Sequence, residues 1–380
     1  MQSDKPKKIE VLIPPAVGYR FSILLRFLFR YGISLRYFHR IVILGLINLI
    51  NMPFRTYERW FINPRFKKQE ISTPVFIIGH WRSGTTHLHN LLCCDPRMGF
   101  VTTYQGVFPD TLFNKVGRFI FKSFTSLLIP RTRKGDNVKL DPNNPQEEEF
   151  ALGDKTPACF YYFWMFPRDT PYFYEKFIRF NGIKPKTLDA WKNDYKLLIN
   201  KALKNTGGET FLSKNPPNTG RVKVLLEMFP DAKFIYIHRN PIEVYLSTRN
   251  FFEKMMPPLQ LQTIDQAEMD NNILTVYKDI LSDYADQKSL IPSGNLIEVR
   301  FSDLEENPME MVERIYDQLK LPGFDEARQE FVNYIKQMKN YRKNEHTIQR
   351  SKLGVILKEW DFAMKNYNYS VPDNIRIEND

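Results

Sequence analysis

One short segment, residues 79–86, concentrates the residue types that could bind an anion: an arginine, two glycines, a serine and two threonines. The four residues before it, 75–78, are apolar and mostly β-branched, which predicts a strand buried on both faces. After it, the leucines within 88–92 recur at helical spacing. A strand, a glycine-rich turn and a helix together predict a phosphate-binding loop, because backbone N–H groups and the positive helix end then point at one anion.

The loop differs from that of enzymes that bind nucleoside triphosphates. Gly79 and Gly84 keep the spacing of the G-x-x-x-x-G-K-[ST] pattern, but Thr85 stands in place of the lysine that contacts the β- and γ-phosphates. The cation lies inside the loop instead, as Arg82. The segment is therefore suited to a phosphate but poorly equipped for a γ-phosphate with its metal. The alternative is an ordinary strand-to-helix turn that happens to contain glycines.

Two further cations follow predicted strands. Lys214 comes directly after a predicted strand at 209–213, and Arg239 directly after another at 233–238. Strands that alternate with helices predict an α/β fold with a mostly parallel sheet, and such sheets bind ligands beyond the carboxyl ends of their strands. Surface solvation would explain any one of these cations. Together with Arg82 they favour a site for a small polyanion.

The composition is consistent with a globular enzyme that binds anions. The 380 residues are 43% hydrophobic and 26% charged, and the formal net charge is +11. A basic chain favours nucleic acid, a membrane surface or a phosphorylated ligand, and the lack of zinc-finger, homeodomain or RNP patterns makes nucleic acid the weakest of the three. The three cysteines, of which two are adjacent, form neither a disulfide framework nor a metal-binding spacing. With no signal-peptide pattern, we expect a cytoplasmic protein without a metal.

The N-terminal residues 14–70 are unusually apolar and rich in arginine. Residues 21–31 predict an apolar helix, and a second apolar run covers 41–50. That run is about half the ~20 residues needed to span a bilayer, and Asn48 interrupts it, so we expect no transmembrane span. The two remaining interpretations are a pair of helices packed on the core and a basic amphipathic element lying on a membrane. Either could wall a pocket for a lipophilic substrate.

Two later segments have both structural and functional interpretations. The aromatic run at 160–166 is typical of a core, but it could also line a lipophilic acceptor pocket. The glutamates at 147–149 stand in the first turn of a predicted helix, where acidic residues complement the helix dipole. One of them could instead be a general base.

Four motifs, in order along residues 75–320, resemble the sulfotransferases that use 3′-phosphoadenosine 5′-phosphosulfate (PAPS), and in particular their bacterial branch. Residues 82–86 resemble the loop that holds the 5′-phosphosulfate, and Lys214 matches a lysine near the transferring sulfuryl group. Arg239, followed eight residues later by Ser247, resembles the pair that holds the 3′-phosphate. Residues 299–308 resemble the late strand-to-helix segment of the family.

This resemblance implies one P-loop-like α/β domain, with a mostly parallel sheet flanked by helices. We expect a helical extension at 14–70, a cofactor-binding core at 71–325 and a helical, basic C-terminal segment at 326–380. Within that segment, the basic stretches 341–346 and 350–354 are the nearest match to a family loop that helps hold the 3′-phosphate. The resemblance thus implies PAPS contacts from Arg82, Ser83, Gly84, Thr85, Thr86, Arg239, Ser247, Arg350 and Lys352.

The general base is where the chain departs from the family pattern. Cytosolic members carry a histidine two residues after the lysine, and this chain has Pro216 there. Tyrosine-directed members carry a glutamate after the loop helix, and residues 100–104 contain none. Residues 145–150 resemble an acidic segment of the bacterial branch, so Glu149 is the first candidate and Glu147 the second. The histidines of the loop helix, His87 and His89, come next.

By analogy with phosphoryl transfer, the protein would mainly position the reactants and neutralise charge. Arg82 would stabilise the leaving phosphate, Lys214 would bridge it to the sulfuryl group, and a carboxylate would take the acceptor proton. Aromatic richness favours a lipophilic alcohol, such as a sterol or another lipid, over a carbohydrate or glycolipid. A nucleotide kinase or NTPase and a membrane-surface scaffold are the rival functions. Thr85, and the lack of a metal-binding aspartate after the third predicted strand, argue against the kinase.

Overall fold

The computed structural model describes residues 15–67, 69–128, 141–338 and 346–380. Its centre is a sheet of five parallel strands in the order β2-β3-β1-β4-β5. The strands are β1 (Val75–Ile78), β2 (Met98–Gly99), β3 (Thr210–Lys214), β4 (Lys233–His238) and β5 (Leu296–Arg300). The predicted α/β fold with a parallel sheet is confirmed. The strands predicted at 75–78 and 233–238 have the bounds that the sequence indicated, and β3 is displaced by one residue.

The strand register brings the carboxyl ends of β1, β3 and β4 to one edge of the sheet. Ile77 of β1 pairs with Lys214 of β3, and Ile78 of β1 pairs with Tyr236 of β4. Helix α3 (Thr85–Leu92) begins after the glycine-rich loop that follows β1. Lys214 and the residues after β1 and β4 are therefore neighbours, as expected for a ligand site at this edge.

Alternate side chains of each strand enter two different cores, as the period of two requires. Val75 and Ile77 pack under α3, α12 (Phe301–Glu306), α13 (Pro308–Gln318) and α14 (Phe324–Met338). Phe76 and Ile78 enter the larger core on the other face. Besides α5 (Lys115–Leu128), the described residues between α3 and β5 form the helices α4 (Thr103–Val107), α6 (Glu148–Lys155), α7 (Thr170–Phe177), α8 (Pro185–Thr206), α9 (Val222–Met228), α10 (Pro241–Leu259) and α11 (Gln266–Gln287). The short 3₁₀ segments among them are η5 (Phe160–Trp164), η6 (Pro167–Asp169), η7 (Pro216–Gly220) and η8 (Lys288–Leu290).

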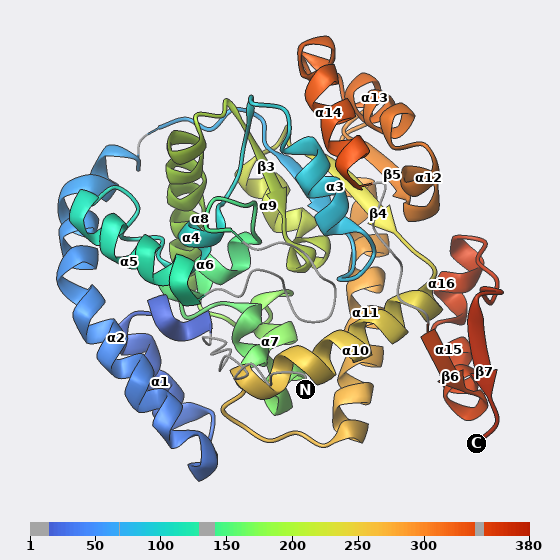
Figure 1. Ribbon diagram of the computed structural model, residues 1–380, viewed down its shortest axis with the longest axis horizontal. Helices are drawn as coiled ribbons and strands as arrows, with labels where there is room; N and C mark the ends of the chain where they lie inside the picture. The colour runs from blue at the N-terminus through green and yellow to red at the C-terminus, as the bar shows by residue number, and fades with distance from the viewer. Residues whose placement is uncertain (1–14, 68, 129–140, 339–345) are drawn as a thin grey trace, which may run out of the picture.

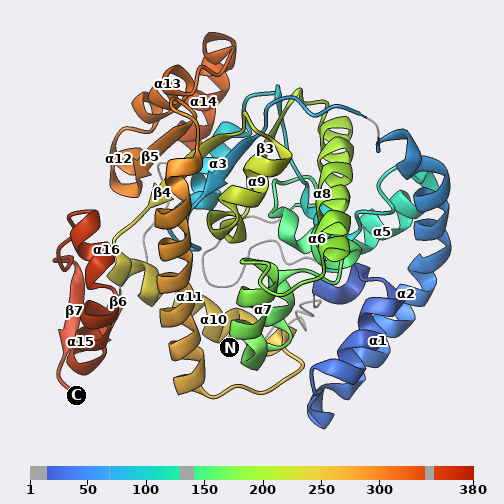
Figure 2. The same cartoon turned by 180° about the vertical axis from the view of Figure 1, so that it is seen from behind.

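Two groups of elements lie at opposite ends of the molecule (Figures 1 and 2). One end holds η1 (Pro15–Gly18), α1 (Phe21–Arg30), η2 (Leu35–Tyr37), α2 (Phe38–Tyr57), the π-helical turn η3 (Glu58–Ile62), η4 (Asn63–Arg65) and α5 (Lys115–Leu128). The other end holds the parallel pair β6 (His346–Gln349) and β7 (Ile375–Glu378) with α15 (Arg350–Glu359) and α16 (Asp361–Asn366). The division into segments 14–70, 71–325 and 326–380 stays a prediction.

The sequence pattern predicts helices over residues 109–130 and 219–228, and both predicted starts are wrong. The helix expected from 109 begins at Lys115, because the Glu58 carboxylate accepts hydrogen bonds from the backbone N–H groups of residues 112–114 and holds them in a turn. The helix expected from 219 begins at Val222, after the proline-containing turn η7.

The second N-terminal helix is longer than the apolar run at 41–50 indicated. Helix α2 continues into η3 and η4, and the whole segment Leu35–Arg65 is long and apolar enough to cross a membrane by length and composition. Within its most apolar stretch, 28% of the residues are buried in the protein.

Candidate active site

The loop after β1 adopts a backbone conformation that only a few residue types tolerate. Gly79, Arg82 and Gly84 have φ angles of 137°, 68° and 94°. A Cβ on Gly79 would lie 2.2 Å from the backbone oxygen of Ile237, and one on Gly84 would lie 2.1 Å from the ring of Phe301. Glycine is therefore required at both positions, and Arg82 is held in the sparsely populated left-handed region, which is common at functional sites.

Arg82 is fixed by contacts with helix α10. Its Nε donates a hydrogen bond to Oγ of Ser247 over 2.9 Å, and its guanidinium lies over the ring of Phe251 at 5.1 Å. Ser83 and Thr85 are buried beside it in the loop, and Thr86 lies in the first turn of α3. The structure thus brings together the loop residues and Ser247.

Arg239 lies near the same loop, on the other side of Phe301. Its guanidinium forms an ion pair with Glu243, at 3.0 and 3.2 Å, and lies 4.8 Å from the centre of the Phe301 ring. Because Phe301 also contacts Gly84, one aromatic ring supports both the glycine turn and Arg239.

Lys214 and Glu147 form a buried ion pair at the end of β3, with side-chain exposures of 3% and 11%. The second carboxylate oxygen of Glu147 accepts a hydrogen bond from the Tyr161 hydroxyl. That hydroxyl in turn accepts one from Nε1 of Trp81 over 2.8 Å. A continuous chain of polar contacts therefore runs from the loop to the ion pair.

The two other glutamates of this segment have different partners. Glu149 is 0% exposed and forms a two-pronged ion pair with Arg221 at 2.7 and 2.9 Å. Burial alone would raise the pKa of Glu149, but the Arg221 charge and the hydrogen bonds to the carboxylate outweigh it and hold the pKa below its usual value. Glu148 accepts hydrogen bonds from Tyr195 and Ser213, and burial raises its pKa.

The loop-helix histidines lie in different surroundings. His89 is buried, which lowers its pKa well below the usual value, and the charge of Lys214 lowers it further. His87 faces Tyr334 of α14, with the ring centres 6.2 Å apart, and burial lowers its pKa too. Of the two, His89 is therefore the one near Lys214.

The C-terminal cations contact other parts of the chain. Lys352 forms an ion pair with Asp270 of α11, and Nε of Arg350 donates to Asn379 over 3.3 Å. Among the described residues, neither has a hydrogen bond to the loop after β1. Their role at the 3′-phosphate stays a prediction, and residues 341–345 of the basic stretch lie outside the described part.

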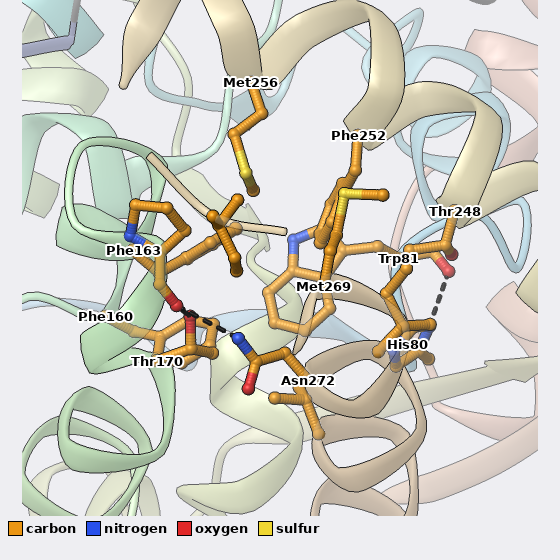
Figure 3. Close-up of a pocket in the computed structure, with 14 residues that line it drawn as sticks. His80, Trp81, Phe160, Phe163, Thr170, Thr248, Phe252, Met256, Met269 and Asn272 are labelled. Atoms are coloured by element: carbon orange, nitrogen blue, oxygen red, sulfur yellow. Dashed lines mark hydrogen bonds between the residues drawn. The ribbon is translucent and has the colours of Figure 1, made fainter. Parts of the chain in front are cut away.

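A narrow apolar pocket lies beside the loop (Figure 3). His80 and Trp81 of the loop, aromatic residues of η5 and the facing sides of α10 and α11 line it. Its free volume is about 20 Å³, which is room for about one water molecule. Burial lowers the pKa of His80 to about 4, so this ring is neutral at pH 7. The sequence singled out the aromatic run at 160–166, but it did not predict the contact between Trp81 and Tyr161, because nothing local signals that residues 80 positions apart will meet.

Among residues 15–67, 69–128, 141–338 and 346–380, no group of three or more His, Cys, Asp or Glu side chains could hold a metal ion.

Comparison with known proteins supports an enzymatic assignment. The model of the "Sulfotransferase family" matches residues 74–326. An omega-hydroxy-beta-dihydromenaquinone-9 sulfotransferase, Stf3, from Mycobacterium tuberculosis is 28% identical over 371 residues, which cover 96% of this chain and 94% of the relative. The Mycobacterium bovis protein of the same name gives the same values.

Solved structures show the same fold at lower identity. The sulfotransferase STF9 from Mycobacterium avium has a TM-score of 0.70 at 18% identity, covering 92% of this chain and 90% of that one. For STF1 from Mycobacterium tuberculosis the TM-score is 0.64 at 16% identity, with 89% and 90% covered. Since the family model matches more than half of the chain, this protein belongs to the sulfotransferase family and is a sulfotransferase enzyme.

Proposed function

We propose that this enzyme transfers the sulfuryl group of PAPS to the hydroxyl of a lipophilic acceptor that occupies the pocket beside the loop. The observation that carries the proposal is the chain of contacts from pocket to ion pair: Trp81 lines the pocket and hydrogen-bonds Tyr161, which hydrogen-bonds Glu147, the partner of Lys214. An acceptor in the pocket would therefore lie next to groups suited to proton transfer and to charge stabilisation.

The cations and hydroxyls at this edge of the sheet suit the two anionic ends of PAPS. Arg82 and the loop amides would hold the 5′-phosphosulfate, and Arg239 with Ser247 would hold the 3′-phosphate. PAPS supplies the sulfuryl group and leaves as 3′,5′-adenosine bisphosphate. Negative charge grows on the departing phosphate during transfer, and preorganised cations such as Arg82 and Lys214 would stabilise it.

Glu147 is the better candidate for the general base. Glu149, favoured from the sequence, is fully buried and its carboxylate is held by Arg221, Asn215 and the backbone N–H of Phe160. A proton on Glu149 would break that ion pair. Glu147 is slightly exposed and pairs with Lys214, the residue that the family places near the sulfuryl group. It would take the acceptor proton as the new sulfur–oxygen bond forms.

The pocket lining favours a lipid alcohol over a sugar. Two of its polar side chains, Asn272 and Thr170, already donate to the Pro167 carbonyl, at 3.0 and 2.6 Å. Thr248 is different: its hydroxyl is buried and has no hydrogen-bond partner among the described residues. A pocket with so few unpaired polar groups fits the apolar body of a lipid better than a sugar, whose hydroxyls each need a hydrogen-bond partner. The mycobacterial relatives are named for a hydroxylated menaquinone, which has that character.

An acceptor of this size needs the pocket to widen. Its free volume of about 20 Å³ is far below the several hundred that a lipid ring system requires. Met256 and Met269 on the facing sides of α10 and α11 are flexible side chains that can repack around a ligand (Figure 3).

The experiment combines cofactor binding with an acceptor screen. Calorimetric titration with 3′,5′-adenosine bisphosphate, in the presence of EDTA, should show binding. Labelled PAPS should then sulfate hydroxylated isoprenoid quinones or sterols in preference to sugars and simple phenols. Met269→Trp, which fills the pocket, should abolish lipid sulfation and leave bisphosphate affinity unchanged. Efficient sugar sulfation that survives in the Met269→Trp variant would refute this acceptor site.

A further inference from the structure

From Asn48 onward, helix α2 has the opposite polarity to a surface helix in water, whereas its first half buries Ile41 and Leu44. Its inward face carries polar residues that are buried, among them Asn48 (1% exposed) and Arg55 (5%), followed by Glu58 (0%) at the start of η3. Its outward face carries apolar residues, including Leu49 (62% exposed) and Ile50 (60%). A surface helix in water has the opposite arrangement, with apolar residues inward and polar residues outward.

The inward polar side chains fix this orientation. Nδ2 of Asn48 donates to the Leu44 carbonyl over 2.9 Å and to the Ala16 carbonyl over 3.3 Å. Arg55 donates to the carbonyl of Tyr19 over 3.1 Å. The Glu58 carboxylate accepts the three backbone hydrogen bonds that start the turn before α5, and it pairs with the buried Lys201 at 2.7 Å. Rotating α2 to bury its apolar stripe would leave these buried polar groups unpaired, which is costly.

The exposed apolar stripe continues onto neighbouring helices. Eighteen of the twenty-one large apolar side chains that are exposed in the described part of the chain lie on α1, η2, α2, η3 and α5. We call their joint surface the apolar face. These elements lie together at one end of the molecule in both views (Figures 1 and 2). The most exposed members are Phe29, Leu35, Leu49, Ile50, Trp60 and Phe119.

The elements that form the apolar face carry surface charges of one sign. Residues 15–65 contain eight arginines, of which Arg55 is buried, and a single acidic residue, the buried Glu58. Helix α5 adds Lys115, Arg118 and Lys122, which line a shallow depression together with Phe119. A second copy of the chain would bring the same cations to the interface, so like charges would oppose a dimer through this face. Anionic lipid headgroups would complement it.

We propose that the apolar face docks this enzyme onto the surface of an anionic bilayer, with the apolar side chains inserted and the arginines among the headgroups. A helix spanning the bilayer would not fit. Lipid on all sides of α2 would separate Arg55 and Glu58 from their partners and place both charges in hydrocarbon. The helix therefore lies on the membrane, held from the protein side.

Docking would also place the acceptor pocket near the membrane. Arg40 of α2 donates to the carbonyls of Gln260 and Pro257, at 2.7 and 3.0 Å. These carbonyls end helix α10, which supplies Met256 to the pocket, and residue 264 just beyond also lines it. A lipid acceptor could thus pass from the bilayer into the pocket. Only this last step rests on the proposed acceptor, since docking itself requires no substrate.

The first experiment measures binding of the full-length protein to vesicles. Co-sedimentation should be strong with phosphatidylcholine vesicles that contain phosphatidylglycerol, weaker with phosphatidylcholine alone, and reduced by salt, because salt screens the arginines. Brominated lipids should quench Trp60, which is 71% exposed, and a Trp60→Phe variant should lose that quenching. Failure to bind anionic vesicles at low salt would overturn the proposal.

Matched variants locate the binding surface. Leu46→Glu, Leu49→Glu and Phe119→Glu combined should lower the vesicle partition coefficient by about 100-fold or more, because three inserted apolar side chains become charged. The control combines Leu290→Glu, Val355→Glu and Ile377→Glu, the exposed apolar residues outside the face, and should bind like the unchanged protein. Equal losses in both variants would overturn the proposal. So would a dimer in sedimentation velocity that only the first variant dissociates. Bisphosphate binding, measured without vesicles, tests the proposed function separately and should persist in both.

Discussion

Nε of Arg82 donates a hydrogen bond to Oγ of Ser247 over 2.9 Å, although 165 residues separate the two positions. The family resemblance assigns these residues to opposite phosphates of PAPS. Their contact couples the loop after β1 to helix α10, so the two halves of the cofactor site would be positioned by one another. Phe251, one turn further along α10, supports the same guanidinium from its ring face.

We expect Arg82→Ala to lower kcat by about 10²-fold or more, the scale for losing one preorganised charge donor. Arg82→Lys should recover little, because a lysine lacks both the Nε donor and the planar fork. Ser247→Ala should weaken bisphosphate binding by roughly 3- to 10-fold, the worth of one hydrogen bond. Labelled-PAPS kinetics and calorimetry provide the two measurements. Unchanged turnover in Arg82→Ala would contradict the assigned role.

Gly84 offers a test of the loop backbone. Gly84→Ala should weaken bisphosphate binding by about 10-fold or more, because φ is 94° and the new Cβ would lie 2.1 Å from the Phe301 ring. Adding Phe301→Leu removes the clash but not the strain, so recovery should be partial. Gly45→Ala is the matched control: this glycine of helix α2 has open space around it, lies outside the proposed cofactor site, and the substitution should leave binding intact. Normal affinity in Gly84→Ala would show that the loop does not hold the ligand.

Local sequence patterns were sufficient to predict the strands at 75–78 and 233–238 and the glycine-rich loop after the first of them. The β-branched run at 75–78, the glycine spacing and the strand-end cations each depend on neighbours in sequence, and the structure confirms the resulting parallel sheet. The convergence of Lys214 with the residues after β1 and β4 follows from parallel topology alone, since all carboxyl ends of the strands meet at one edge.

Long-range pairings could not be predicted in the same way. Which glutamate of 147–149 meets Lys214 and which meets Arg221 depends on the entry of α6 into the core, not on the helix pattern. The polar residues within α2 were interpreted from the sequence as an interruption of an apolar run. In the structure they are its buried face, because η1 and the turn before α5 supply their partners.

Two histidines should lower the free energy of unfolding in mild acid. Burial lowers the pKa of both His80 and His238 to about 4, whereas an unfolded histidine titrates near 6.5. Between these values the unfolded chain binds protons that the folded protein excludes, so the free energy of unfolding decreases as pH falls from about 6.5 to about 4. Each group contributes roughly 1.4 kcal/mol per pH unit within that window. Glu148 and Asp154 act in the opposite direction, because burial raises the pKa of both carboxyls, that of Asp154 to about 6.

His238→Phe isolates one of these contributions. The substitution keeps an aromatic ring against Tyr367, whose centre lies 4.2 Å away, while removing the titrating group. Urea titrations at several pH values give the free energy of unfolding. Its slope against pH should correspond to about one proton fewer taken up on unfolding than in the unchanged protein. An identical pH dependence in the variant would mean that His238 is not held neutral.

Glu149 and Glu147 should respond differently to substitution by glutamine. Glu149→Gln leaves the buried Arg221 charge without its carboxylate, and breaking a buried ion pair costs about 3–5 kcal/mol. The free energy of unfolding should therefore decrease by roughly that amount, and the midpoint of thermal unfolding should fall. If activity per folded molecule is retained, Glu149 has a structural role.

Glu147→Gln also removes the charge partner of the buried Lys214, so it should lower stability too, but its distinguishing effect should be on chemistry. The amide still accepts a hydrogen bond from Tyr161 but cannot take the acceptor proton, so kcat should decrease by about 10²- to 10⁴-fold. Bisphosphate affinity should be nearly unchanged, because the proposed role lies on the acceptor side. Glu147→Asp should restore part of the turnover, since a carboxylate remains. If Glu147→Gln keeps its turnover while His89→Ala loses it, the histidine beside Lys214 is the base and the carboxylate serves only to hold the lysine.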